Sequence, residues 1–253
     1  MTLTDANDQT PTFTSGSTTL SVAEGSSASI DSFSITDTDT VGTLACAESG
    51  NDADDFACDI SGGTLTITWS ATPDYDSAAD SDTDNVYSYT ITVGDGTNNA
   101  AAVTYTVTVT DINDQTPSYS SSDTTPSITE GNTAVETLTV TDTDTGDSNS
   151  CTLAGADAGS FTCSVSGDSV SLAFSSAPDY DVPGSADGDV DYAVTLTISD
   201  GTNTGSTISY TVSVADANDQ TPTFTTGSTT LSVAEGSSAS IDSFSITDTD
   251  TVG

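Results

Sequence analysis

The most informative absence in this 253-residue sequence is that of cationic side chains: it has no lysine, arginine or histidine against 39 aspartates and glutamates. No salt bridge between side chains can form, and the formal net charge of −39 makes the chain repel itself. Nucleic acid and membrane contact are not expected of this segment, because binding to phosphate groups needs lysine or arginine. Dissolved cations are therefore the charge partners that the chain requires.

Other absences narrow the class of protein. The sequence has no apolar run of about 18 residues that would cross a membrane as a helix, and no signal peptide precedes Met1. We expect any export signal or anchor to lie outside this sequence. A serine nucleophile would lack a histidine or lysine base. Clustered carboxylates are better explained as metal ligands than as a glycosidase pair, so we do not expect an enzyme.

What the sequence does contain is a long internal repeat. A motif of two carboxylates and one carboxamide recurs at intervals of 106 and 105 residues, each time before the residues Gln-Thr-Pro. Its copies are Asp5, Asn7 and Asp8; Asp111, Asn113 and Asp114; and Asp216, Asn218 and Asp219. Residues 9–42 match residues 220–253 except for Ser15 against Thr226. The sequence is thus expected to be a window from a longer tandem array.

The repeat predicts the domain organisation. Residues 1–8 are expected to end the last strand of a preceding repeat, residues 9–114 and 115–219 to be two full repeats, and residues 220–253 to begin a truncated third. The oxygen-rich motif falls in the linker after each repeat. Ca²⁺ takes six to eight oxygen ligands, so a linker of this kind suits it. A solvated polar turn is the alternative for any single copy.

The four cysteines form two pairs, Cys46 with Cys58 and Cys151 with Cys163. Both pairs are 12 residues apart and occupy equivalent places in the two full repeats. This pattern predicts one disulfide in each repeat and an oxidising, extracellular compartment. A zinc site is disfavoured, because the sequence has no Cys-x-x-Cys and no histidine.

Apolar and polar residues alternate along many short segments. The clearest expected strands cover residues 63–69, 87–93 and 103–109, and residues 170–174, 192–198 and 208–214. Trp69 falls within one of them and is expected in a core. No segment has the 3.6-residue period of a helix. The sequence therefore predicts an all-β fold of tandem Ig-like Greek-key β-sandwiches, about seven strands each, joined by calcium-binding linkers.

Several motifs occur in a fixed order in each repeat. In the first full repeat they are Glu24 before Gly25, Asp74 and Asp76 in Pro-Asp-Tyr-Asp, and Asp95 before Gly96. The linker motif and then Asp142-x-Asp144 follow. In this order and at this length the chain resembles tandem cadherin-type repeats, of the kind found in giant microbial surface and extender proteins. The resemblance covers essentially the whole chain and implies about three Ca²⁺ ions at each junction between repeats.

Carried over residue by residue, the resemblance implies three sets of metal ligands. The junction between the two full repeats would use Glu24, Asp74, Asp76, Asp111, Asn113, Asp114, Asp142, Asp144 and Asp200. The following junction would use Glu130, Asp179, Asp181, Asp216, Asn218, Asp219, Asp248 and Asp250. The preceding junction keeps Asp5, Asn7, Asp8, Asp37, Asp39 and Asp95.

Two features depart from the animal members of this family. Asp76 and Asp181 stand where animal cadherins usually have the longer glutamate, and no tryptophan lies near an N-terminal strand for strand exchange. We therefore do not expect cell adhesion by the animal mechanism. The expected function is that of a calcium-rigidified extracellular filament, stalk or adhesin extender. Its partners would be further copies of the repeat in the same chain, with lateral self-association into fibres or bundles.

A binding module is the alternative. It would recognise glycans or another copy of itself through a sandwich surface, and a solvent-facing aromatic cluster would favour it. The sequence offers only the scattered tyrosines Tyr75, Tyr119 and Tyr180.

Overall fold

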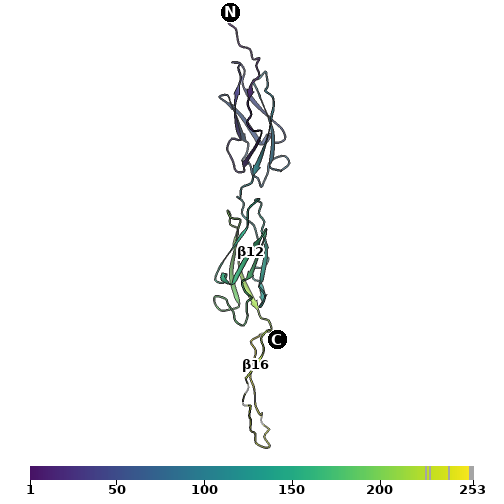
Figure 1. Cartoon of the computed structure of the whole chain (residues 1–253), viewed down its shortest axis with the longest axis vertical. Coiled ribbons are helices and arrows are strands. Elements are labelled where there is room, and N and C mark those ends of the chain that lie inside the picture. Colours follow the sequence, from purple (N-terminus) through teal and green to yellow (C-terminus); the bar gives the residue numbers. More distant parts are fainter. Residues whose placement is uncertain (226, 228, 239, 251–253) are drawn as a thin grey trace. The chain divides into compact units, whose positions relative to one another are not determined.

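The computed structural model describes residues 1–225, 227, 229–238 and 240–250. It is built from strands and two short 3₁₀ turns, η1 (Ala53–Asp55) and η2 (Ala158–Ser160), without an α-helix in the described part of the chain. Figure 1 traces the chain through its sandwiches, with β12 and β16 labelled. Within these residues, no helix has the length and apolar character needed to cross a membrane. The chain divides into two compact units, one of Met1–Asn113 with Thr143–Thr145, the other of Asp114–Asp142 with Gly146–Gly253.

The first full repeat is a sandwich of two four-stranded sheets, with strand orders β1-β3-β6-β5 and β2-β8-β7-β4. All of its pairs are antiparallel except β2 with β8, which are parallel. The strands are β1 (Thr12–Phe13), β2 (Thr19–Ala23), β3 (Asp31–Thr36), β4 (Ala45–Ser49), β5 (Phe56–Ser61), β6 (Thr64–Trp69), β7 (Val86–Gly94) and β8 (Val103–Thr110).

The second full repeat is a sandwich of a three-stranded sheet, β10-β13-β12, and a four-stranded sheet, β11-β14-β15-β9, and an isolated bridge between Ser118 and Thr141 takes the place of β1. Its strands are β9 (Ser127–Thr129), β10 (Ala134–Thr139), β11 (Ser150–Ala154), β12 (Phe161–Ser166), β13 (Ser169–Phe174), β14 (Asp191–Ser199) and β15 (Ile208–Ala215). In the third repeat, β16 (Thr223–Phe224) pairs with β17 (Ile246–Thr247). Positions 226, 228, 239 and 251–253 of the predicted third repeat lie outside the described residues.

The predicted all-β sandwich class is confirmed, and the alternating pattern explains it. Along β7, Tyr87, Tyr89, Ile91 and Val93 are buried while the residues between them are not. Because successive side chains of a strand point to opposite faces, this pattern places one face of each sheet in the core. The alternation over residues 28–36 predicts one strand, and the strand that forms, β3, begins only at Asp31.

Trp69 contributes to the core from its edge. Its ring is half-buried and stacks on Phe56, with centroids 4.7 Å apart. Leu65 and Ile67, on the same face of β6, are fully buried. Stacking of this kind adds about 1 kcal/mol to the burial itself. Leu65, Ile67 and Trp69 therefore share one face of β6, with the tryptophan at its outer end.

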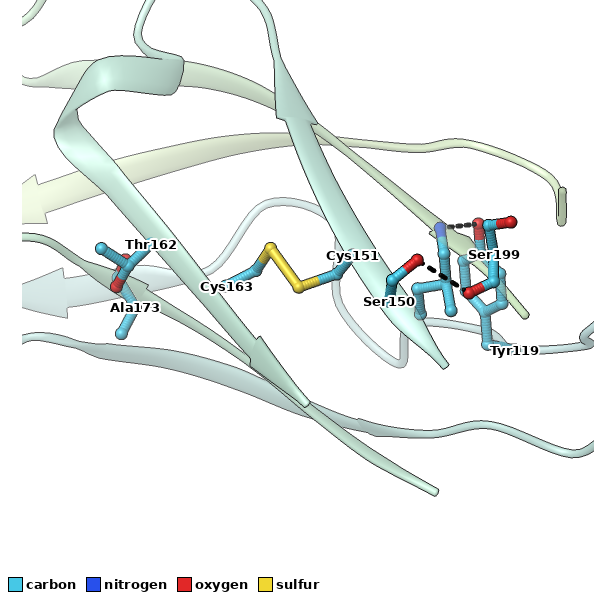
Figure 2. The surroundings of a disulfide bond; sticks show 8 residues. Tyr119, Ser150, Cys151, Thr162, Cys163, Ala173 and Ser199 are labelled. Atoms are coloured by element: carbon cyan, nitrogen blue, oxygen red, sulfur yellow. Dashed lines mark hydrogen bonds between the residues drawn. A yellow bond between two sulfur atoms is a disulfide. The ribbon is translucent and has the colours of Figure 1, made fainter. Parts of the chain in front are cut away.

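Each sandwich has one disulfide between its two sheets. Cys46 on β4 bonds Cys58 on β5, and Cys151 on β11 bonds Cys163 on β12. Figure 2 shows the second of these bonds crossing from β11 to β12. In both repeats the two strands are edge strands of opposite sheets. The disulfide thus closes one side of the sandwich, where no backbone ladder joins the sheets.

Candidate metal centre

Glu24 is the carboxylate about which the end of the first repeat is built. It follows β2 directly and is only 5% exposed. Its Oε2 accepts a hydrogen bond from the amide of Tyr75 at 2.7 Å, and its Oε1 accepts one from the amide of Ile112 at 2.8 Å. One side chain therefore fixes both the Pro-Asp-Tyr-Asp motif and the start of the linker. Charged acceptors of this kind make the stronger class of hydrogen bond.

Two further carboxylates join Glu24. One oxygen each of Glu24, Asp74 and Asp76 lie within 4.8 Å of one another. Gly25 holds the turn beneath them: its φ is +69°, and its amide donates to the carbonyl of Pro73 at 2.9 Å. Three anions this close repel unless a cation lies among them. Because Ca²⁺ prefers carboxylate oxygens, the donor set suits that ion.

The second repeat has the same hydrogen bonds around its buried glutamate. Glu130 is 7% exposed, and its two oxygens accept hydrogen bonds from the amides of Tyr180 and Ala217, both at 2.7 Å. Asp179 accepts a hydrogen bond from the amide of Val182 at 2.9 Å. Burial and the negative charges of Asp250, Asp216, Glu130 and Asp179 together raise the pKa of Asp181. This electrostatic environment favours a bound cation at Asp181.

At the opposite end of the first repeat, Asp37, Asp39 and Asp95 form a second cluster of carboxylates within 4.8 Å. Asp95 is 2% exposed, and its Oδ1 accepts hydrogen bonds from the amides of Thr97 and Asn98, both at 2.7 Å. The hydrogen bond from the Asn98 amide is the main cause that lowers the pKa of Asp95. The carboxylate is therefore held ionised and in a fixed position, as a metal ligand needs to be.

The segment that precedes the first repeat lies on this cluster. Asp5 accepts hydrogen bonds from the amide of Thr40 at 2.7 Å and from its hydroxyl at 2.6 Å, and these lower the pKa of Asp5. The amide of Gln9 donates to Asp39 at 2.7 Å, and the Asn7 side chain donates to the Asp95 carbonyl at 3.3 Å. The predicted ligands Asp5 and Asn7 are thus brought to the same end of the first repeat as Asp37, Asp39 and Asp95.

Later linkers repeat parts of this geometry. Asp111 accepts hydrogen bonds from the amide and hydroxyl of Thr145, as Asp5 does from Thr40. The Gln115 side chain donates to Asp114 at 2.8 Å, as Gln9 does to Asp8 and Gln220 to Asp219. Asp200 accepts from the amides of Thr202 and Asn203, matching Asp95. Repetition of these contacts indicates that the linker motif has one preferred local structure.

The remaining predicted ligands differ in their burial and in the hydrogen bonds that they accept. Asp248 accepts a hydrogen bond from the amide of Asp250 at 3.4 Å, and Asp250 accepts one from the Gln220 amide at 3.0 Å. Asn218 is exposed, and Asn113, Asp142 and Asp216 are half-buried. Asp144 is buried. The sharing of an ion across the boundary between the two units stays a prediction.

One cluster was not predicted from the sequence. Asp80, Asp82 and Asp84 lie in the loop before β7, with one oxygen of each within 4.8 Å of the others. A contact with the carboxyl of Asp80, together with the charges of Asp84 and Asp80, raises the pKa of Asp82. Their spacing at every second residue is a signal that the sequence does contain. It was missed because the second repeat has Ser185 in place of Asp80.

The fold matches that of tandem cadherin extracellular repeats in solved structures. The structure of protocadherin gammaB7 EC3-6, a cis-dimer, is 21% identical with a TM-score of 0.64, over 98% of this chain and 63% of that one. The protocadherin gammaB4 extracellular domain is 25% identical with a TM-score of 0.66, over 98% and 39%. Mouse cadherin-23 EC22-24 is 20% identical with a TM-score of 0.64, over 96% and 79%.

This likeness establishes the fold: the chain consists of cadherin-type β-sandwiches in tandem. The chain spans less than two thirds of the length of the two protocadherin chains. No protein-family model matches the sequence, and no curated protein does. The predicted resemblance to cadherin repeats is thus confirmed by structure, at sequence identities of 20% to 25%.

Proposed function

We propose that this chain is part of a calcium-rigidified extracellular array that acts as a structural filament, stalk or adhesin extender. The observation that carries the proposal is the pair of buried glutamates, Glu24 and Glu130. Each ties the linker that follows its repeat to the Pro-Asp-Tyr-Asp motif by two hydrogen bonds. Cadherin-type folds act as structural and adhesive modules, and this chain would use them as spacers.

Charge supports a cation at each junction. The junction between the two full repeats gathers eight predicted carboxylate ligands, and about three Ca²⁺ ions would bring about six positive charges. Those carboxylates are Glu24, Asp74, Asp76, Asp111, Asp114, Asp142, Asp144 and Asp200. No side chain of this sequence could neutralise them, because it has no lysine, arginine or histidine. With ligands from a linker and from both of its neighbouring repeats, bound ions would restrict bending there.

The proposed location is extracellular. Two disulfides, one in each full repeat, fit an oxidising compartment. Further copies of the repeat in the same chain are the first proposed partners. Lateral self-association into fibres or bundles is the second. The protocadherin gammaB7 structure is described as a cis-dimer, which is consistent with self-association of such repeats.

A glycan-binding module finds less support. Tyr75, Tyr119 and Tyr180 are all half-buried and pack against the cores of their own repeats. The Tyr119 hydroxyl accepts a hydrogen bond from the amide of Ile198 at 3.0 Å (Figure 2). These rings serve the sandwich and do not form a recognition face. An enzyme is not proposed, since a serine nucleophile would have no histidine or lysine as its base.

Calcium binding to the whole chain tests the proposal. Asp76→Asn and Asp181→Asn each remove a carboxylate from a proposed junction, while Asp59→Asn removes one exposed carboxylate from β5 as the control. Ca²⁺ at about 100 times its dissociation constant should stabilise the wild type by about 2.7 kcal/mol per site. The two junction variants should need more Ca²⁺ for the same rise in melting temperature. Equal Ca²⁺ dependence in all four proteins would reject the proposed junction sites.

A further inference from the structure

The loop of residues 77–85 in the first repeat, which follows the predicted junction ligand Asp76, has its own group of carboxylates. Asp80, Asp82 and Asp84 alternate with Ser81 and Thr83, and one oxygen of each aspartate lies within 4.8 Å of the others. The loop is anchored to the sandwich by Asp52, whose carboxylate accepts hydrogen bonds from the amides of Ser81 at 2.8 Å and Ser88 at 2.7 Å. The three aspartates therefore converge on one place beside a fixed support.

Asp80 is the most buried of the three aspartates, and one of its carboxylate oxygens accepts no hydrogen bond from the described residues. It is 3% exposed, and its Oδ2 accepts a hydrogen bond from the amide of Asp84 at 2.9 Å. Its Oδ1 is buried without any hydrogen bond within the described chain. A buried carboxylate oxygen without a partner is strongly destabilising. Because the sequence has no cationic side chain, the missing partner has to come from solution.

The equivalent loop of the second repeat has a hydroxyl in place of this buried carboxylate. Ser185 takes the place of Asp80, and its hydroxyl lies 3.2 Å from Asp187 Oδ1 and 2.6 Å from the Asp189 carbonyl. Asp157 anchors this loop through the amides of Ala186 and Ala193, as Asp52 does in the first repeat. The second loop is thus closed by a proton donor of its own. At the equivalent position the first loop has a third carboxylate, which in its ionised form cannot donate a hydrogen bond.

We propose that Asp80, Asp82 and Asp84 bind one divalent cation of the calcium class inside the first repeat, in addition to any ions at the junctions. Carboxylates at alternate positions of a loop are a ligand arrangement that suits Ca²⁺, with water completing the coordination. Ca²⁺ fits better than Mg²⁺, which demands near-ideal octahedral geometry and gives up its water reluctantly. The ion supplies the positive charge that the buried Oδ1 of Asp80 lacks.

An aromatic side chain next to the loop offers a direct probe. The Tyr87 hydroxyl accepts a hydrogen bond from the amide of Ala79 at 3.1 Å, one residue before Asp80. The Tyr87 ring also contacts Trp69, with centroids 5.0 Å apart. Tb³⁺ takes the same oxygen ligands as Ca²⁺, and nearby aromatic rings transfer excitation to it. Tb³⁺ bound at Asp80 should therefore emit when these rings are excited.

The experiment uses the full chain and an exchange of residues between its two repeats. Asp80→Ser installs the residue of the second loop, which keeps a donor to close the loop but removes a ligand. We expect this variant to bind about one ion fewer in Ca²⁺ titration and to lose part of the Tb³⁺ emission. Asp76→Asn reports on the junction in parallel, so failure of the junction sites and failure of this site can be told apart.

The reverse exchange gives a result that misfolding could not explain, because it is expected to add a site. Ser185→Asp recreates the three-carboxylate loop in the second repeat and should add about one bound ion. Unchanged ion counts and Tb³⁺ emission in Asp80→Ser, with no gain in Ser185→Asp, would overturn the proposal. So would a ¹³C spectrum in which an Asp80 or Asp82 carboxyl is protonated at neutral pH and does not respond to Ca²⁺, since a proton would then be the missing partner.

Discussion

Glu24 and Tyr75 lie 51 residues apart in the sequence and are joined by a 2.7 Å hydrogen bond from the Tyr75 amide to the Glu24 carboxylate. The other oxygen of Glu24 accepts the amide of Ile112, so a single buried side chain connects the end of β2, a loop and the linker. Asp74 and Asp76, which we propose as calcium ligands, flank the residue whose amide Glu24 holds. These hydrogen bonds therefore order the end of the first repeat through residues of that repeat alone.

Glu24→Gln should destabilise the first repeat even without Ca²⁺. Glutamine turns one of the two acceptors into a donor that faces the amide of Tyr75 or Ile112, and the loss should be about 2 kcal/mol in the free energy of unfolding. Glu235→Gln is the matched control, because Glu235 occupies the same motif in the third repeat but is exposed. Urea denaturation in chelator measures both. Equal effects of the two substitutions would contradict the role assigned to Glu24.

The disulfides should stabilise each repeat separately. Replacing Cys151 and Cys163 by serine should lower the free energy of unfolding of the second repeat by about 3 kcal/mol, since the closed loop is short. Replacing Cys46 and Cys58 should do the same for the first repeat. Calorimetry of the intact chain resolves the two transitions. A loss spread over both transitions would show that the two sandwiches unfold together.

Stability of the second repeat should depend on pH through Glu136. Burial acts to raise the pKa of Glu136, but hydrogen bonds from Ser121, Tyr210 and Ser122 outweigh it and lower the pKa overall. A carboxyl with a lowered pKa stabilises the fold above its unfolded value of about 4.3 and loses this contribution as pH falls through the folded value.

Melts of the wild type and Glu136→Gln between pH 7 and pH 3 test this dependence. The stability difference between them should be constant near neutral pH and shrink below about pH 4.3. Tyr210→Phe removes one of the donors, so it should show a smaller acid-dependent loss than the wild type. A difference that stays constant down to pH 3 would mean that these hydrogen bonds do not lower the pKa of Glu136.

Salt should replace part of the effect of calcium. Without Ca²⁺, the 39 carboxylates repel one another, and NaCl at about 0.15 M screens charges beyond about 8 Å. The melting temperature of the chelated chain should therefore rise with NaCl, and that of the Ca²⁺-saturated chain should rise less. Parallel salt series in chelator and in Ca²⁺ measure this. Equal slopes would indicate that bound Ca²⁺ does not relieve the repulsion.

Much of the fold follows from the sequence because its strands are short and alternate strictly. β6 and β8 lie within one residue of their predicted bounds, since a one-residue shift would turn every core side chain toward water. The strands that carry the cysteines, β4, β5, β11 and β12, were not assigned from the sequence. They are edge strands with weaker alternation, so their place is fixed by pairing and by the disulfides.

The sequence predicts which residues form the candidate site, but it does not predict the hydrogen bonds that hold them. Repetition of the motifs brings out Glu24 and Glu130, yet their partners are backbone amides 50 to 88 residues away, which carry no sequence signal. The Asp80 loop could not be found from the repeat for a different reason. Comparison of the repeats emphasises what they share, so a cluster that only the first repeat has was passed over.

Small-angle X-ray scattering of the whole chain, with Ca²⁺ and with chelator, tests most directly the claim that calcium makes the array rigid. In millimolar Ca²⁺ the chain should have one well-defined maximum dimension, and chelation should change that dimension and make the scattering that of a flexible chain. Asp114→Ala should show intermediate flexibility in Ca²⁺ while both sandwiches keep their melting temperatures, because Asp114 is an exposed linker residue. An unchanged maximum dimension and unchanged flexibility on chelation would contradict the central claim.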